Sequence, residues 1–297
     1  MIEIKDLTKV YKSGKGVFDV SFEVKQGEVF GFLGPNGAGK TTTIRNLLGF
    51  LNPDQGSCRI SNLDCWSNAA KIQEFVGYIP GEIAFIDNMT GISFLNLIAK
   101  MRKMQNFTRK NELIEILDFN PKGKIRNMSK GMKQKLGIIT AFMHDPEVYI
   151  LDEPTSGLDP LMQTIFVDII LEEKKRNKTI LMSSHSFEEI ERTCDRAGII
   201  KEGRIATIQD IHSLKASQRK VFSINVSSQK DLDNIKASTL EVVSIKDNFI
   251  EIAISGNYEE FFKVLSKCNV ISLDAAAQNI EQIFMQYYGT EGGKNHE

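Results

Sequence analysis

The feature that most constrains the fold of this chain is a glycine-rich loop between an apolar run and an amphipathic segment. The loop spans residues 34–41 and reads GPNGAGKT, directly after the run Val29–Leu33. The run is short and bounded by glycines, which predicts a buried strand, and the pattern from Thr42 to Leu48 predicts the start of a helix. A glycine loop in this context turns successive backbone N–H groups inward, so we expect the segment to bind polyphosphate.

Two residues at the end of the loop carry more specific chemistry. Lys40 places a positive charge beside the outer phosphates, and Thr41 offers a hydroxyl oxygen to Mg²⁺, which prefers hard oxygen ligands shared with the nucleotide. The alternative is a glycine-rich turn without a ligand, but the glycine, lysine and threonine positions and both flanking elements fit a phosphate loop. The residues expected to bind nucleotide here are Gly34, Pro35, Asn36, Gly37, Ala38, Gly39, Lys40, Thr41 and Thr42.

Composition narrows the class of protein. The chain has 297 residues, a formal net charge of −1, 25% charged residues and 41% hydrophobic residues. These are ordinary globular values for roughly two domains, and the charge balance does not favour a nucleic-acid partner. The 4 cysteines lack metal-ligand spacing, so neither a zinc site nor a disulfide framework is expected. No apolar run approaches the roughly 20 residues of a membrane span, and the first residues do not resemble a signal peptide.

A second candidate segment is the apolar run Val148–Leu151, which precedes Asp152 and Glu153. Such a run predicts a buried parallel strand with its acids at the carboxyl end, where open parallel sheets bind ligands. Phosphoryl transfer to water needs a held metal and an oriented water molecule. Neighbouring strand residues point to opposite faces, so we expect Asp152 to hold the metal through water and Glu153 to act on the attacking water, as its general base or as the group that orients it. The alternative is that Asp152 and Thr155 merely cap the following segment.

The order of predicted elements indicates a strand-and-helix domain followed by a smaller one. Residues 92–119 have helical spacing, and a further helix is predicted from Asn127 to Met143 with Ser129 as its N-cap. A helix over about 161–175, a strand over 179–182 and a hairpin that turns at Gly203 continue the alternation. After Leu214 the predicted order β-α-β-β-α-β resembles a ferredoxin-like module, with helical spacing again at 280–287.

Together these motifs resemble the ATPase subunit of an ABC transporter over about residues 1–211. The segments 34–41, 127–134, 148–152 and 156–159 stand where that family has Walker A, the signature, Walker B and the D-loop. Taken alone, Tyr11 and His185 are more often structural, but the resemblance implies that Tyr11 stacks on adenine and that His185 is the switch histidine, a catalytic residue like Glu153. Asp159 belongs to the D-loop.

The resemblance also implies a fold and a division into domains. The fold is of the α/β class, a P-loop ABC ATPase with a RecA-like parallel-sheet core and antiparallel β and helical subdomains, followed by a small α+β ferredoxin-like domain. The expected domains are 1–213, with the helical subdomain at about 85–145, then 214–290, and a frayed tail at 291–297. The accessory domain is expected to stabilise a dimer or to regulate.

The family implies an Mg²⁺-dependent ATPase that dimerises head to tail around two ATP molecules. Ser129 and Gly131 of one copy then bind the γ-phosphate held by the other copy, while Lys130 either adds charge there or lies outside. The signature MSKGM resembles that of bacterial exporters of the bacitracin-resistance type. The family also implies that an integral membrane permease, a separate polypeptide, docks on the helical block from Phe85 to about Asn127, and that the chain is a peripheral subunit at the cytoplasmic face of the membrane.

Two other functions remain as alternatives. A soluble ATP-driven switch could act on a ribosome, DNA or a scaffold, but such family members carry two cassettes or a long coiled coil, and this sequence has one phosphate loop and no heptad run. A nucleotide-binding regulator without hydrolysis is disfavoured by the presence of both Asp152 and Glu153.

The signature departs from the family pattern, since it reads MSKGM where the commonest family form is LSGGQ, and the segment after Ile79 departs from it as well. Where the family has glutamine or glutamate directly after a proline, this chain has Pro80, Gly81 and then Glu82. Either Glu82 replaces the missing metal ligand, because glycine lets the backbone shift by one residue, or sensing of the γ-phosphate is weakened.

Overall fold

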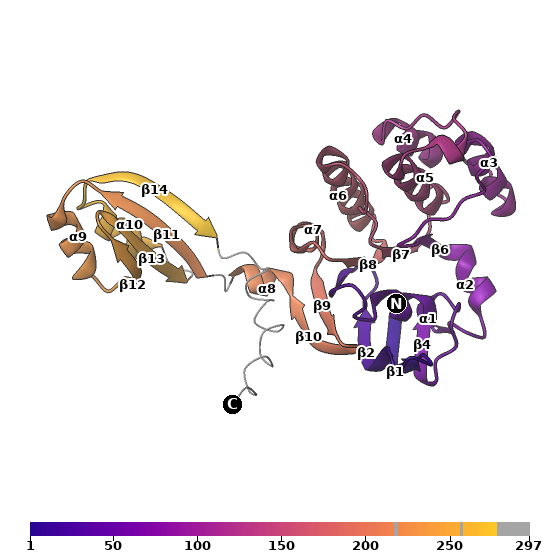
Figure 1. Cartoon of the computed structure of the whole chain (residues 1–297), viewed down its shortest axis with the longest axis horizontal. Helices are drawn as coiled ribbons and strands as arrows, with labels where there is room; N and C mark the ends of the chain where they lie inside the picture. The colour runs from indigo at the N-terminus through magenta and orange to yellow at the C-terminus, as the bar shows by residue number, and fades with distance from the viewer. Residues whose placement is uncertain (217–218, 256–257, 278–297) are drawn as a thin grey trace. The chain divides into compact units, whose positions relative to one another are not determined.

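The computed structural model describes residues 1–216, 219–255 and 258–277 (Figure 1). The chain divides into two compact units with the boundary between Gln209 and Asp210, and each unit is described by itself. Within the described residues, no helix combines the length and the apolar character that crossing a bilayer requires.

The first unit contains a four-stranded and a six-stranded sheet. The four-stranded sheet has the order β2-β1-β4-β5, and its neighbouring strands are antiparallel. The six-stranded sheet has the order β10-β9-β3-β8-β7-β6, in which β9, β3, β8, β7 and β6 are parallel. The strands are β1 (Ile2–Val10), β2 (Gly16–Val24), β3 (Val29–Leu33), β4 (Gln55–Ile60), β5 (Leu63–Asp64), β6 (Val76–Ile79), β7 (Val148–Asp152), β8 (Thr179–Ser184), β9 (Arg196–Lys201) and β10 (Arg204–Asp210).

Helix α1 (Lys40–Leu47) contributes to one core that both sheets share. The fully buried side chains of Ile44 and Leu47 on this helix belong to the same apolar cluster as residues of β1, β2, β3 and β7. Phe22 of β2 stacks on Phe30 of β3 with ring centroids 5.0 Å apart. Helix α1, which begins with the last residues of the glycine loop, is therefore held in place by apolar packing in the core that both sheets share.

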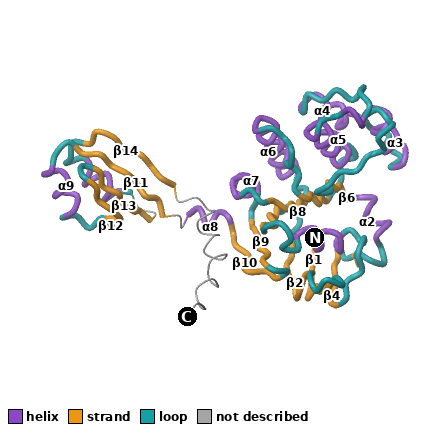
Figure 2. Tube along the Cα trace, in the orientation of Figure 1, coloured by secondary structure: helices purple, strands orange, loops and turns teal. Residues whose placement is uncertain are grey.

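Helices gather in the segment between β6 and β7 (Figure 2). Helix α2 (Ala69–Phe75) precedes β6, and α3 (Gly91–Met101), α4 (Thr108–Ile116) and α5 (Lys130–Phe142) follow it. The prediction of a helix from Asn127 was wrong at its start, because residues Ile125–Asn127 form a 3₁₀ turn and α5 begins at Lys130. The predicted cap is confirmed, since the Ser129 hydroxyl accepts a hydrogen bond from the backbone N–H of Met132.

Two more helices of the first unit pack near the parallel sheet. Helix α6 (Pro160–Lys175) follows β7, and α7 (Phe187–Thr193) follows β8. The short α7, like α2, was not predicted, because seven residues are too few for a clear helical period.

The second unit has the predicted ferredoxin-like arrangement. After α8 (Ile211–Ala216) come β11 (Arg219–Val226), α9 (Gln229–Lys236), β12 (Glu241–Lys246), β13 (Phe249–Ser255), α10 (Glu259–Leu265) and β14 (Val270–Ala277). The strand order is β12-β13-β11-β14, and all neighbours are antiparallel. Ile224, Ile252 and Phe261 form part of its own buried core. The helical spacing at 280–287 and the tail at 291–297 lie outside the described residues.

Candidate functional site

The glycine loop joins β3 to α1 and ends in a backbone conformation that favours glycine. Gly39 has φ +117°, and a Cβ there would lie 2.6 Å from Cγ1 of Val17. Immediately after it, Lys40 is only 5% exposed, and its ammonium donates hydrogen bonds to the carbonyl oxygens of Gly34 at 2.6 Å and Pro35 at 3.3 Å. The loop thus curls around its own lysine.

The acidic end of β7 meets this loop. The Thr41 hydroxyl donates to Oδ2 of Asp152 at 2.8 Å, and Lys40 Nζ lies 3.3 Å from Oε1 of Glu153. Strand register produces this meeting, because β3 and β7 both pair in parallel with β8, so their carboxyl ends lie at one edge of the sheet. Two side chains of the glycine loop therefore each contact one side chain of the acidic pair, Thr41 with Asp152 and Lys40 with Glu153.

Asp152 is fixed on both of its oxygens. Its Oδ1 accepts a hydrogen bond from the Ser183 hydroxyl at 2.5 Å, and Ser183 is the register partner of Asp152 on β8. The carboxylate is 1% exposed, so these hydroxyls offset the loss of water around it. Ser183 was not predicted as a site residue, although a polar residue at the end of an apolar strand was the available signal.

Glu153 has an unusual backbone conformation. Its φ is +48°, which a non-glycine residue rarely adopts, and its N–H donates to Oγ of Ser183 at 3.0 Å. The carboxylate then lies between Lys40 and His185, with His185 Nδ1 3.7 Å from Oε2. Strained backbone held by neighbouring bonds is concentrated at functional sites, which supports a chemical role for Glu153.

A cavity of about 330 Å³ opens over the loop. The hydroxyl of Tyr11 lies 3.4 Å from Oγ1 of Thr42 at its rim, and the Tyr11 side chain is partly exposed. The residues that line this cavity are Tyr11, Ser13, Lys15, Gly16, Pro35, Asn36, Gly37, Gly39, Lys40, Thr41, Thr42 and Glu153. Apart from Ser13, Lys15 and Gly16, all of them were predicted as site residues.

The oxygens at this site fit Mg²⁺. Thr41 supplies a hydroxyl and Asp152 a carboxylate, both hard donors, and their contact shows that one ion could reach both. No group of three or more His, Cys, Asp or Glu side chains within the described ranges could cage a metal. An Mg²⁺ ion at Thr41 would therefore take its remaining ligands from nucleotide and water, as Mg²⁺ commonly does.

The start of α5 contacts the segment after β7 in the same chain. Lys130 Nζ donates to Oγ of Ser156 at 3.1 Å, and a Cβ on Gly157 would lie 2.8 Å from Cδ of Lys130. Deeper in α5, the buried amide of Gln134 donates to the carbonyl oxygen of Pro154 at 2.6 Å. Lys130 thus contacts its own D-loop, and the side chain of Ser129 is exposed.

Asp159 forms the N-cap of α6. Its Oδ1 accepts a hydrogen bond from the N–H of Met162 at 3.0 Å, and Pro160 occupies the first helical position. This capping role fixes where the D-loop ends.

The position that departs from the family pattern lies beside Asp152. A Cβ on Gly81 would lie 3.3 Å from Oδ2 of Asp152, so glycine leaves this place without a side-chain ligand. Glu82 is exposed and is not among the residues that line the loop cavity. Nearby, burial and the Asp152 charge raise the pKa of Tyr78 to about 12, which keeps this phenol neutral.

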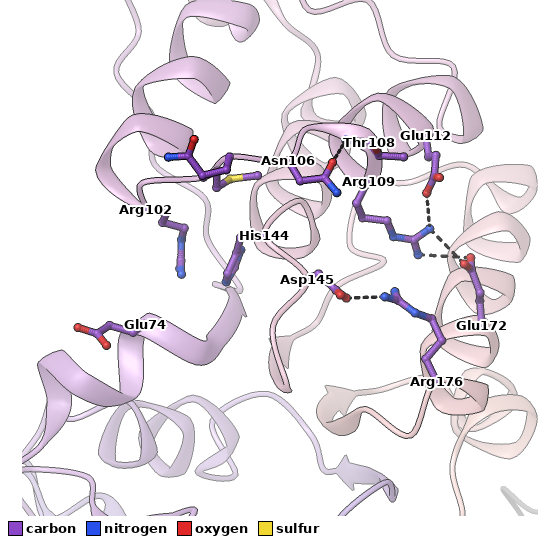
Figure 3. A pocket seen from close by; sticks show the side chains of 12 residues that line it. Glu74, Arg102, Asn106, Thr108, Arg109, Glu112, His144, Asp145, Glu172 and Arg176 are labelled. Carbon is purple, nitrogen blue, oxygen red and sulfur yellow. Dashed lines mark hydrogen bonds and ion pairs between the residues drawn. The ribbon is translucent and has the colours of Figure 1, made fainter.

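A larger cavity, of about 680 Å³, lies elsewhere (Figure 3). Arg102 and His144 line it, and both bond the carbonyl oxygen of Val76, the first residue of β6. This is the amino end of the strand, away from the edge that carries Asp152. Figure 3 also shows Arg109 facing Glu172, with which it pairs at 3.2 Å. The cavity is lined mostly by charged and amide side chains, and ion pairs join Arg109 to Glu112 and Glu172, and Arg176 to Asp145.

Comparison with known proteins finds relatives over most of the chain. Residues 17–156 match the family model described as ABC transporter. The chain is 40% identical over 235 residues to the bacitracin transport ATP-binding protein BcrA of Bacillus licheniformis, which covers 77% of this chain and 76% of that protein. It is 30% identical over 309 residues to the linearmycin resistance ATP-binding protein LnrL of Bacillus subtilis (strain 168), covering 97% and 98%.

A solved structure is similar as well. The structure, described as the ATP binding subunit of an ABC transporter, covers 72% of this chain and 92% of its own, with a TM-score of 0.66 and 30% identity. The segment that matches the family model contains both the glycine loop and the acidic pair at 152–153, and it ends before His185.

Proposed function

Since this chain belongs to the family of ABC transporter ATP-binding subunits, which are ATPases, we propose that it hydrolyses ATP with Mg²⁺ and drives export through a separate membrane permease. The observation that carries the chemical part is the meeting of Thr41 with Asp152 and of Lys40 with Glu153 at one edge of the sheet.

Each of these side chains has a distinct task in the proposed reaction. Lys40 and the backbone N–H groups of residues 36–41 bind the outer phosphates, and Tyr11 stacks on the adenine ring. Thr41 and Asp152 hold Mg²⁺, which when bound neutralises charge on the phosphate oxygens. Glu153 accepts a proton from the attacking water through its carboxylate, and His185 at 3.7 Å orients that carboxylate.

A dimer completes the pocket in this proposal. The residues that line the loop cavity include none from α5, so the exposed Ser129 and the N–H groups of Lys130 and Gly131 serve a second copy. A helix N-terminus favours an anion, here the γ-phosphate bound by the other copy. Lys130 is then a tie to its own D-loop through Ser156 rather than a phosphate ligand.

The transport role rests on the relatives. One is described by bacitracin transport and the other by linearmycin resistance, which supports export of a toxic compound. We propose that an integral membrane subunit docks on the helical block from Phe85 to about Asn127, and that the chain is a peripheral protein at the cytoplasmic face of the membrane. No nucleic-acid partner is proposed. Residues 1–213 would then carry the ATPase function, and the accessory domain would support the dimer or its regulation.

Two variants and one pull-down test this proposal. Lys40→Ala is expected to lose nucleotide binding, whereas Glu153→Gln keeps ATP bound and hydrolyses it at least about 100-fold more slowly. An integral membrane protein should co-purify with the full chain from detergent extracts. Wild-type turnover by Glu153→Gln would contradict the base assignment, and ribosomes or DNA in the pull-down would contradict the transport role.

A further inference from the structure

A buried carboxylate that no step above uses lies next to the hydrolytic residues. Glu189 on α7 is 7% exposed, and its Oε2 accepts a hydrogen bond from the Ser184 hydroxyl at 2.6 Å and from the Thr155 hydroxyl at 3.5 Å. Its other oxygen, Oε1, is buried and has no hydrogen-bond partner among the described residues. Such an arrangement is costly for a folded protein, so it calls for an explanation.

The local sequence predicts a simpler role for this residue. Ser186 caps α7 and Glu189 is the third helical residue, which is the spacing of a capping box. In a capping box the glutamate would accept a hydrogen bond from the N–H of Ser186. Here that N–H donates instead to Oγ of Ser184 at 2.9 Å, and Glu189 bonds the same hydroxyl from inside. The carboxylate is therefore turned inward, away from the helix end it could cap.

The two hydroxyls that Glu189 contacts lie on the two segments that present the hydrolytic side chains. Ser184 ends β8 and directly precedes His185, and Thr155 follows Glu153 by two residues. A cavity of about 360 Å³ separates the D-loop from α7, and both His185 and Glu189 line it. Across this cavity, Glu189 is hydrogen-bonded to Thr155, in the segment that follows Glu153, and to Ser184, in the segment that precedes His185.

We propose that Glu189 is a positioning residue for hydrolysis, which holds the Thr155 segment and the Ser184 segment together so that His185 stays beside Glu153. This inference rests on the proposed function. Burial also raises the pKa of Glu189 to about 7, which agrees with a carboxyl group kept for its hydrogen bonds rather than for its charge. Glutamine should therefore replace it, because the amide oxygen still accepts from both hydroxyls.

The test compares Glu189→Ala, Glu189→Gln and the control Glu188→Gln in the full-length chain, alone and with its co-purified membrane subunit. Glu188 is the neighbouring residue on α7, and its exposed side chain pairs only loosely with Arg192 at 3.8 Å. Misplacement of a catalytic pair by about 1 Å can slow a reaction about 100-fold, so Glu189→Ala should lower kcat by about 10-fold to 100-fold. Affinity for a fluorescent ATP analogue should change less than about 2-fold, because Glu189 does not line the loop cavity. Glu189→Gln and Glu188→Gln should both retain kcat.

Amide hydrogen exchange supplies a readout that needs no turnover. Exchange at 155–158 and at 184–187 should accelerate together in Glu189→Ala and stay unchanged in Glu189→Gln. The inference is overturned if kcat of Glu189→Ala matches wild type, if affinity falls as much as kcat, or if only one of the two segments exchanges faster. Failure of the wild-type chain to hydrolyse ATP even with its membrane subunit would instead overturn the proposed function, and with it this inference. Wild-type hydrolysis with normal Glu189→Ala kinetics would overturn the role of Glu189 alone.

Discussion

The hydroxyl of Thr41 donates to Oδ2 of Asp152 at 2.8 Å, although the two residues lie 111 positions apart in the chain. The contact joins the end of the phosphate loop to the end of the acidic strand. The contact forms because β3 and β7 both pair in parallel with β8, so the carboxyl ends of β3 and β7 lie at the same edge of the sheet.

The Thr41–Asp152 contact predicts a magnesium phenotype for Thr41→Val. Valine keeps the shape of threonine but lacks the hydroxyl, so we expect the Mg²⁺ concentration for half-maximal hydrolysis to rise about 10-fold or more, with binding of metal-free ATP little changed. The measurement is ATPase activity against Mg²⁺ at saturating ATP. Thr140→Val is the control, since that hydroxyl donates to Leu136 within α5. Equal magnesium curves for both variants would exclude Thr41 as a ligand.

A complementation experiment tests whether the pocket is shared between copies. Ser129→Arg disrupts the start of α5, which in the proposed dimer binds the γ-phosphate held by the other copy. Lys40→Ala disrupts the phosphate loop, so each variant should be inactive alone. In an equal mixture, half of the dimers are mixed and each mixed dimer holds one complete site, so activity should return to at most about a quarter of the wild-type value. No recovery after subunit exchange, checked by mass spectrometry of the mixed dimers, would argue that each chain acts by itself.

His144 predicts a loss of stability in acid. Burial is the main cause that lowers the pKa of His144 to about 4, from an ordinary value of 6.5, so the folded state disfavours its protonation. Its contribution to stability is therefore present above about pH 6.5 and is lost as the pH falls toward 4, by about 3 kcal/mol over the full interval. Urea denaturation at pH 7 and at pH 4.5 should show a smaller pH dependence in His144→Gln than in wild type. His185→Gln is the control because that side chain is 67% exposed, and the same flattening in both variants would refute the prediction.

The Arg109–Glu173 ion pair predicts a large stability effect at the edge of the 680 Å³ cavity. Glu173 on α6 is fully buried, and Arg109 on α4 is 11% exposed on its side chain. Arg109→Ala removes one of the cations that pair with the buried Glu173 and leaves its ion pair with Arg176, which should cost about 3 kcal/mol. Glu112→Gln removes only an exposed partner of Arg109 and should cost less than about 1 kcal/mol. Chemical denaturation of the full chain measures both, and equal costs would show that the buried pair has no special weight.

Sequence patterns predicted the elements that carry a clear period and the motifs that carry unusual spacing. The apolar runs at 29–33 and 148–151, the cap at Ser129 and the order of strands and helices after Leu214 all agree with the structure. Local patterns were sufficient there because burial, capping and turn chemistry act within a few residues.

Other contacts depend on tertiary structure and had no local signal. The inward turn of Glu189 contradicts its capping-box spacing, because Ser184 takes the N–H that the spacing assigns to the glutamate. The contact of Lys130 with Ser156 joins segments 26 residues apart, and no periodicity encodes it. The exposed Glu82 could be located only once the backbone at Gly81 was seen beside Asp152.

The bond from Lys130 to Ser156 has a consequence for how two copies would communicate. In the proposed dimer, the start of α5 senses the neighbour's nucleotide, and the same lysine holds the loop that directly follows the chain's own Glu153. Binding of ATP in one pocket would therefore shift, through Lys130, the loop that follows Glu153 in the other pocket. The rate of ATP hydrolysis would then rise with ATP concentration more steeply than a simple hyperbola. In Lys130→Ala, the two pockets of the dimer would hydrolyse ATP independently of each other.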